Sequence, residues 1–317
     1  MTVGEPSRAA KSVARVARAW ATISAHEIHI RSQDGADFQA TCFRDVANPP
    51  RALLVFTPAM GARASYYHGL AQELAGRGLC VFVADLRGIG SSSVRAGRDV
   101  DFGYHELISL DLPAVIASAR RFCPTTPLVL VGHSIGGHIS AMYAGIHPGE
   151  IQALVLIATG TSFFENWSVP KRMGILAMAT LTRLITAAFG YFPGRYFGFF
   201  GREARRLMHE WRTLTMTGRF EVTGSVHDFE ERLLRVKLPV LAISFPGDVF
   251  APEEAVKHFM GKMPLTEVAY RHIQPRELGA RSLNHFRWAK YPAPVANVIS
   301  QWLLETPGPL LRNEHLS

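Results

Sequence analysis

The sequence predicts an α/β fold with a mostly parallel central sheet and helices on both of its faces. Short apolar runs that are typical of buried strands alternate with stretches of helical periodicity. The sharpest strand-to-helix junction, at residues 128–144, carries small residues that permit a tight turn. The alternation stops between residues 161 and 236, which indicates an insertion into one α/β domain.

The individual elements follow from these patterns in chain order. Alternating apolar and polar residues at 26–31 and 38–44 flank Gln33-Asp34-Gly35, the pattern of a hairpin. Further strands are expected at 51–57, 80–84, 128–131, 151–158, 238–244 and 267–273. Helices are expected at 66–77, 104–122, 135–144 and 294–304. Residues 1–22 form a basic arm or helix, residues 23–160 and 237–317 form the core, and residues 161–236 form a helical lid.

Composition indicates an ordinary globular protein, because 48% of the residues are hydrophobic and 19% are charged. The cysteines Cys42, Cys80 and Cys123 lack metal-ligand spacing, and buried thiols suit a reducing compartment such as the cytoplasm. The most apolar long stretch, 173–189, is interrupted by Arg183. It is interpreted as a buried or lid helix and not as a membrane span.

The net charge of +8 is concentrated in two arginine-rich regions. One is the N-terminal arm, and the other contains Arg202, Arg205, Arg206, Arg212 and Arg219. These regions are either solvated helix faces or surfaces that attract an anionic lipid or a CoA-like substrate. Membrane contact is therefore a possible role of the arm or the lid. No nucleic-acid-binding motif accompanies the charge, and the oligomeric state is left open.

The strand-to-helix junction contains the pattern Gly-x-Ser-x-Gly, with Ser134 at its centre. A serine in such a turn adopts a strained backbone, so residues two positions away on either side must lack colliding side chains. Gly132 and Gly136 meet this requirement. Ser134 is therefore the candidate nucleophile; the alternative is a glycine-rich turn without chemistry.

A serine hydroxyl needs a base that accepts its proton and an acid that orients the base. Asp248 follows a predicted buried strand in a Gly-Asp turn and is the candidate acid, although such a residue can also serve only the turn. His285 lies in a loop between the last strand and the closing helix and is the candidate base, with His272 as the alternative. His133 and His138 are expected to be packing or cavity-wall residues.

A tetrahedral intermediate also needs backbone donors for its oxyanion. The amide that follows the nucleophile belongs to Ile135. The second donor is expected in the loop after the strand that ends at Thr57, where Met60 is the best candidate.

These motifs together resemble the α/β-hydrolase superfamily, and most of all its monoglyceride lipase and serine aminopeptidase-like group with uncharacterised bacterial relatives. The resemblance covers about residues 25–160 and 238–305. It is carried by Pro58-Ala59-Met60-Gly61, the stretch from Asp85 to Ser91, the Ser134 turn, Gly247-Asp248 and Asn284-His285-Phe286. Relatives commonly carry His-Gly where this chain has Pro58-Ala59.

The resemblance implies a serine hydrolase with a Ser-Asp-His triad that needs neither a metal nor an organic cofactor. The aromatic insertion suggests an apolar acyl pocket, and a small acyl ester is the expected substrate. Two alternatives stay open. One is an acyltransferase that uses the same acyl-enzyme, and the other is a binding protein that keeps the fold without turnover.

Overall fold

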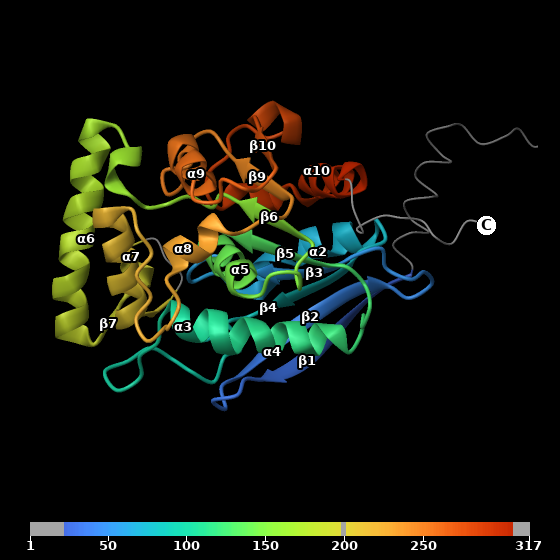
Figure 1. Ribbon diagram of the computed structural model, residues 1–317, viewed down its shortest axis with the longest axis horizontal. Coiled ribbons are helices and arrows are strands. Elements are labelled where there is room, and N and C mark those ends of the chain that lie inside the picture. Colours follow the sequence, from blue (N-terminus) through green and yellow to red (C-terminus); the bar gives the residue numbers. More distant parts are fainter. Residues whose placement is uncertain (1–21, 198–200, 307–317) are drawn as a thin grey trace, which may run out of the picture.

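The structure is a computed structural model that describes residues 22–197 and 201–306 (Figure 1). The basic arm expected at 1–22 lies, apart from Thr22, outside the described residues. An eight-stranded sheet with the order β1-β2-β4-β3-β5-β6-β9-β10 forms the centre of the molecule. Every neighbouring pair from β4 to β10 is parallel, and the two antiparallel pairs are β1–β2 and β2–β4. The expected mostly parallel sheet is confirmed.

The strands of this sheet lie close to the expected positions. They are β1 (Ile23–Arg31), β2 (Asp37–Asp45), β3 (Leu53–Thr57), β4 (Cys80–Ala84), β5 (Leu128–His133), β6 (Ala153–Ile157), β9 (Val240–Ser244) and β10 (Val268–His272). The two short strands β7 (Tyr191–Phe192) and β8 (Glu203–Ala204) pair in a sheet of their own.

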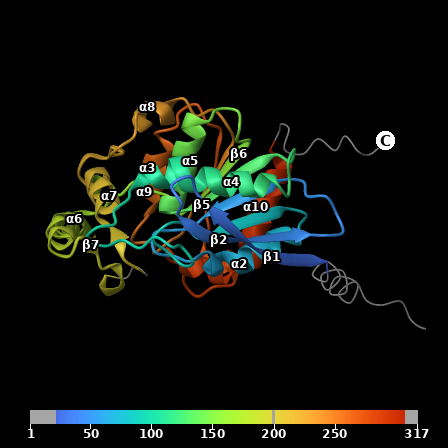
Figure 2. The ribbon, with the colours of Figure 1, turned by 90° about the horizontal axis from the view of Figure 1, so that it is seen from below.

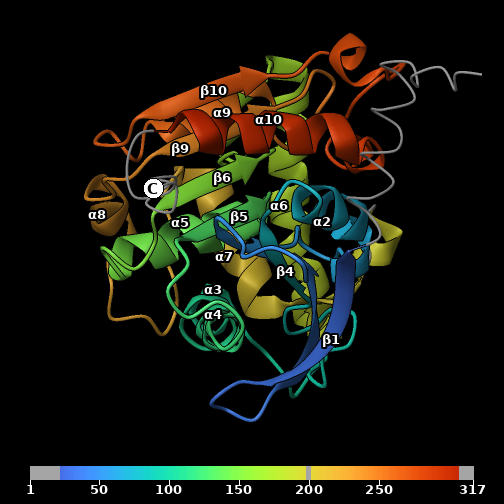
Figure 3. The same cartoon turned by 90° about the vertical axis from the view of Figure 1, so that its right-hand side faces the viewer.

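Helices cover both faces of the large sheet, as Figures 2 and 3 show. The helices α2 and α10 pack together on one face, while α4 and α5 lie on the other. The helices are α2 (His68–Ala75), α3 (Tyr104–Glu106), α4 (Leu112–Arg120), α5 (Ile135–Ile146), α6 (Val169–Phe189), α7 (Arg205–Thr217), α8 (Phe229–Leu234), α9 (Glu253–Met260) and α10 (Pro292–Glu305).

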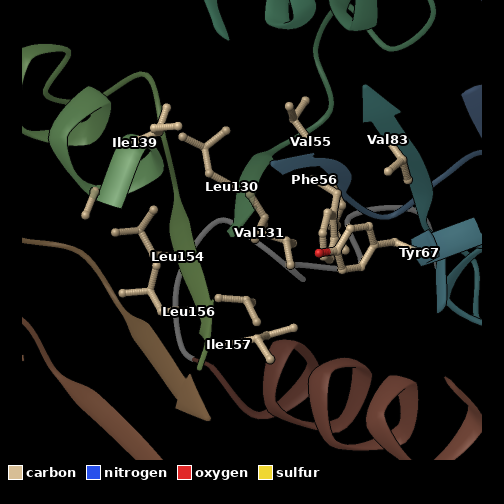
Figure 4. Close-up of a cluster of buried hydrophobic side chains, with 14 of the residues drawn as sticks. Val55, Phe56, Tyr67, Val83, Leu130, Val131, Ile139, Leu154, Leu156 and Ile157 are labelled. Carbon is tan, nitrogen blue, oxygen red and sulfur yellow. The ribbon is translucent and has the colours of Figure 1, made fainter. Parts of the chain in front are cut away.

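The central strands are continuous apolar runs because a strand covered on both faces has no side that meets water. Every residue of β3, β4, β5, β6 and β9 is buried. Their branched side chains interdigitate with those of the covering helices, as the close-up of Val55, Leu130 and Ile139 shows (Figure 4). The three cysteines are buried free thiols, as expected.

The helix expected at 104–122 is not continuous. It begins as α3, passes through a π-helical turn at Leu107–Asp111 (η2), and resumes as α4. Pro113 in the first turn of α4 has no amide hydrogen to bond a preceding carbonyl, so a regular helix cannot pass through it. The irregular turn places Asp111 against Arg87, with 2.6 Å between the Asp111 Oδ1 and Arg87 Nη2 atoms.

The segment 161–236 contains α6, α7, α8 and the β7–β8 pair. Helix α6 packs against α7 beyond the sheet edge at which the parallel strands end (Figure 1). Residues 173–189 are expected to form a buried helix or a lid helix, and the first of these alternatives is wrong, because only 17% of the most apolar part of α6 is buried. By length and composition alone, α6 is the one helix in the described part of the chain that could cross a membrane.

Candidate active site

The turn between β5 and α5 holds Ser134 in a backbone conformation that non-glycine residues rarely adopt, with φ of 56° and ψ of −121°. Close approach of the chain explains both flanking glycines. A Cβ on Gly136 would lie 2.0 Å from the Thr57 carbonyl oxygen, and one on Gly132 would lie 2.3 Å from the Gly137 nitrogen. The Ser134 amide donates to the Ile157 carbonyl at 3.0 Å, which ties the turn to β6.

Ser134 opens into a cavity of about 430 Å³ between the sheet edge and the segment 161–236. His285 and the two residues expected to donate to an oxyanion, Met60 and Ile135, line the same cavity. The rest of the wall is mainly apolar. It includes Trp167, Ile175, Met178, Phe192, Phe197, Met208, Trp211, Val249, Phe250 and Phe286.

The structure brings Asp248 and His285 together. The Nδ1 atom of His285 lies 2.9 Å from Oδ2 and 3.1 Å from Oδ1 of Asp248, and both residues are buried. The Asp248 carboxylate also accepts hydrogen bonds from the amides of Phe250 and Ala251, at 2.9 and 2.8 Å. These bonds fix the carboxylate, which in turn orients the imidazole and leaves the Nε2 atom of His285 free to serve another group.

No hydrogen bond joins Ser134 Oγ and His285 among the residues that the structure describes. The two residues share the cavity wall instead. Nucleophile–base bonds are often long in ligand-free sites and shorten once substrate is bound, so the arrangement remains compatible with catalysis.

The alternative base, His272, belongs to a different cluster. Its Nδ1 atom bonds the Ser244 hydroxyl at 2.7 Å at the end of β9 and β10. Its carboxylate neighbour is Glu253, at 3.8 Å, and not Asp248. Of the two histidines, only His285 lines the cavity that contains Ser134.

The two residues that are expected to donate backbone amides to an oxyanion, Met60 and Ile135, both line the cavity. Ile135 is the first residue of α5, so its amide has no acceptor within the helix. Met60 lies in the loop after β3. The preceding residue, Ala59, is anchored because its amide donates a hydrogen bond of 3.1 Å to the Tyr67 hydroxyl oxygen. The loop position of Met60 is therefore set by a buried side chain of the next segment.

A buried chain of hydrogen bonds supports His285 from behind and involves residues that the sequence did not reveal. The Trp288 indole donates to His133 Nε2 at 3.4 Å, and His133 Nδ1 lies 2.8 Å from the Tyr67 hydroxyl. The rings of His133 and His285 lie 4.7 Å apart.

Burial keeps both histidines beside the nucleophile neutral. It lowers the pKa of His133 well below its usual value, and the neighbouring His285 lowers it further. Burial likewise lowers the pKa of His138 to about 4. His138 bonds the Tyr104 hydroxyl at 2.9 Å and the Gly160 carbonyl at 3.1 Å, and it forms part of the cavity wall.

Comparisons with known proteins agree with this geometry. The family described as "Serine aminopeptidase, S33" matches residues 48–190. The "Monoacylglycerol lipase" of Mycolicibacterium smegmatis is 34% identical over 133 residues, which cover 40% of this chain and 46% of the relative. The human "Monoglyceride lipase" is 33% identical over 109 residues, 34% of this chain and 35% of the relative. The chain has an α/β-hydrolase fold and is similar to monoglyceride lipases.

The expected likeness of this α/β-hydrolase to the monoglyceride lipase group is confirmed by these matches. The chain nevertheless spans less than half the length of the curated relatives it matches. A solved structure described as "The structure of DcsB complex with its substrate analogue" shares the fold, with a TM-score of 0.64 and 16% identity over 90% of this chain and 100% of that chain.

Proposed function

We propose that this α/β-hydrolase is a serine hydrolase that cleaves a carboxylic ester of a small apolar substrate. One observation carries the proposal. Ser134, His285, Met60 and Ile135 line one largely apolar cavity, and Asp248 holds His285 at 2.9 Å. A strained serine at the end of a buried strand, with donors and an oriented base around it, is the arrangement that acyl transfer requires.

In the proposed reaction, the Ser134 hydroxyl attacks the ester carbonyl while His285 Nε2 takes its proton. The oxygen of the tetrahedral intermediate is stabilised by the amides of Met60 and Ile135. His285 then protonates the leaving alkoxide as the ester C–O bond breaks, which leaves an acyl-enzyme and a free alcohol. A water molecule, deprotonated by His285, attacks the acyl-enzyme and releases the carboxylic acid and Ser134.

The segment 161–236 is proposed to be the lid of this site. Its side chains Ile175, Met178 and Trp211 form part of the wall opposite Ser134. An acyl chain buried against these side chains gains binding energy in proportion to the apolar area removed from water. The names of the curated relatives, which are lipases of monoacylglycerol, agree with an acyl chain of this kind.

The exposed face of α6 is proposed to contact a lipid surface. Val169, Met173 and Leu184 are 71%, 68% and 64% exposed, so their burial at a membrane interface would be favourable. The cavity wall includes Ile175 and Met178 of the same helix. An acyl chain could therefore move from a membrane to the site along one element.

The test is hydrolysis of para-nitrophenyl esters from acetate to palmitate by the full chain. We expect an optimum at a chain longer than acetate, and Ile175→Trp should move it to shorter chains by filling the cavity. Leu181→Trp, on the same helix but outside the cavity wall, is the matched control and should leave the optimum unchanged. An acceptor-dependent product with little hydrolysis would instead indicate an acyltransferase.

A further inference from the structure

A second cavity, of about 480 Å³, lies beside the one that contains Ser134. At two places in the chain, consecutive residues line the two cavities. Met60 lines the first cavity and Gly61 the second, and Phe192 of the first is flanked by Tyr191 and Pro193 of the second. The second cavity is built from the loops after β3 and β4 and from the β7–β8 region of the segment 161–236.

Arginines dominate the wall of this second cavity. Its described lining contains four of them and no aspartate or glutamate; the four are Arg63, Arg95, Arg195 and Arg202. None of the four forms an ion pair with a carboxylate within residues 22–197 and 201–306. Other arginines of the same region are paired, since Arg205 bonds Asp101 and Arg206 bonds Glu106. The wall of this cavity thus carries four guanidinium groups that have no carboxylate partner in the described part of the chain.

Neighbouring groups hold three of the guanidinium groups in place. Arg202 lies over the Tyr191 ring at 4.9 Å, and Arg195 donates to the Tyr196 hydroxyl at 2.7 Å. Arg95 is fixed by carbonyl oxygens of its own loop, among them that of Gly90 at 2.6 Å. The Arg63 side chain is exposed and makes no hydrogen bond within the described part of the chain. The wall therefore combines preorganised cations with one free donor.

We propose that this cavity binds a phosphate group on the leaving group of the substrate. Guanidinium groups bind phosphate oxygens through paired hydrogen bonds. Four guanidinium groups offer more donors than a single carboxylate can accept. The inference rests on the proposed function. The acyl chain occupies the apolar cavity, and the phosphate-bearing alcohol or thiol extends past Met60 to the arginines. When the acyl–oxygen or acyl–sulfur bond breaks, His285 returns the proton to the departing oxygen or sulfur.

Two pairs of substrates test this inference and separate the sources of the phosphate. The first pair is 1-oleoylglycerol 3-phosphate and 1-oleoylglycerol; the second is oleoyl-CoA and the phosphate-free thioester S-oleoyl-N-acetylcysteamine. For one pair, kcat/KM of the wild-type chain should favour the phosphorylated member by about tenfold or more. The pair with the larger ratio identifies an acylglycerol phosphate or a CoA thioester as the source. The preference should weaken as salt is added.

Arginine variants locate the effect at the cavity. Arg63→Ala and Arg202→Ala should each lower the ratio of the two kcat/KM values by about tenfold. Arg63→Lys should keep more of the preference than Arg63→Ala, because it retains the charge. Arg276→Ala removes an exposed cation from a short helical turn outside the cavity and should leave the ratio unchanged.

Equal kcat/KM values within both pairs, with ester turnover intact, would overturn the phosphate cavity and leave the proposed hydrolase standing. If no ester is hydrolysed at all, binding of glycerol 3-phosphate to the Ser134→Ala variant by calorimetry tests the cavity on its own. Binding that disappears in Ser134→Ala/Arg202→Ala would support the cavity. Binding that survives in this double variant, or no binding to Ser134→Ala, would refute it.

Discussion

Two of the three proposed catalytic residues are held by the backbone of their own segment. Ser134 is held by the turn with a φ of 56°, and Asp248 by two amides of the turn that follows it. His285 is in turn oriented by Asp248. The glycines around Ser134 are visible in the sequence because the close approach of the chain leaves no room for a side chain. In contrast, the sequence did not indicate the roles of Tyr67 and Trp288, because their hydrogen bonds to His133 join residues that are far apart in the chain.

Replacing the proposed acid tests its role at the residue scale. Asp248→Asn should keep the fold but allow His285 to adopt the wrong tautomer, because an amide can donate to Nδ1. We expect kcat for ester hydrolysis to fall by about 10³- to 10⁴-fold, measured by steady-state kinetics.

The alternative base provides the matched control for this experiment. His272→Gln alters the histidine that bonds Ser244 and lies outside the cavity. It should change kcat by less than about threefold. A loss as large as that of Asp248→Asn would assign the base to His272 and contradict the arrangement described here.

At the scale of elements, periodicity located the strands of the core to within a few residues. The apolar runs are recognisable in the sequence because a strand buried on both faces is made mainly of apolar residues. The interruption at η2 was missed, although Pro113 is visible in the sequence; the contact of Asp111 with Arg87, a residue of another loop, is visible only in the structure. The composition of 161–236 indicated an insertion, but not that α6 turns so much of its apolar surface toward solvent.

A buried carboxyl of α7 predicts a pH dependence of stability. Glu210 accepts hydrogen bonds from the amides of Tyr104 and Thr223, both at 2.8 Å, and burial raises its pKa from 4.5 to about 7. A raised pKa means that the folded state holds the proton more tightly than the unfolded state does. The stabilising contribution of the protonated carboxyl is present below pH 4.5 and is lost as the pH rises to about 7.

Glu210→Gln removes this titration. The free energy of unfolding of the variant, relative to wild type, should therefore rise between pH 4.5 and 7, by on the order of 3 kcal/mol. Urea titrations at several pH values measure this difference. Glu231→Gln, at an exposed position, should show no such trend. A flat difference for Glu210→Gln would show that the carboxyl is ionised in the folded protein.

At the scale of the whole molecule, one buried cation links three distant segments. Arg87, after β4, bonds Asp111 of η2 at 2.6 Å and Asp34 of the β1–β2 turn at 2.7 Å. Arg87 and Asp111 are buried, so loss of the guanidinium would leave the Asp111 carboxyl without its counterion. The sequence identified the loop from Asp85 to Ser91 as a family motif. It did not indicate that Arg87 of this loop connects three segments.

Arg87→Ala should lower the free energy of unfolding by about 3–5 kcal/mol, because breaking a buried pair leaves an uncompensated charge. Thermal and urea unfolding measure the loss. Arg235→Ala breaks an exposed pair with Glu231 and should cost less than about 1 kcal/mol. Equal effects of the two variants would contradict the structural role of the Arg87 network.

The alternation of strands and helices predicted the parallel sheet, because parallel neighbours need a long crossover connection. Ser134, Asp248 and His285 each follow the end of a strand, and the fold brings these segments together at one edge of the sheet. The second cavity could not be predicted. Its arginines come from three segments, and only the fold brings Arg63 and Arg95 to Arg195 and Arg202.

The central claim is that Ser134 is an activated nucleophile. Labelling of the folded chain with a fluorophosphonate, followed by peptide mass spectrometry, tests it most directly. We predict one label per chain, on Ser134, and none on Ser134→Ala with an unchanged fold. No label on the native chain, or a label that persists in Ser134→Ala, would contradict the proposed hydrolase and favour a binding protein built on the same fold.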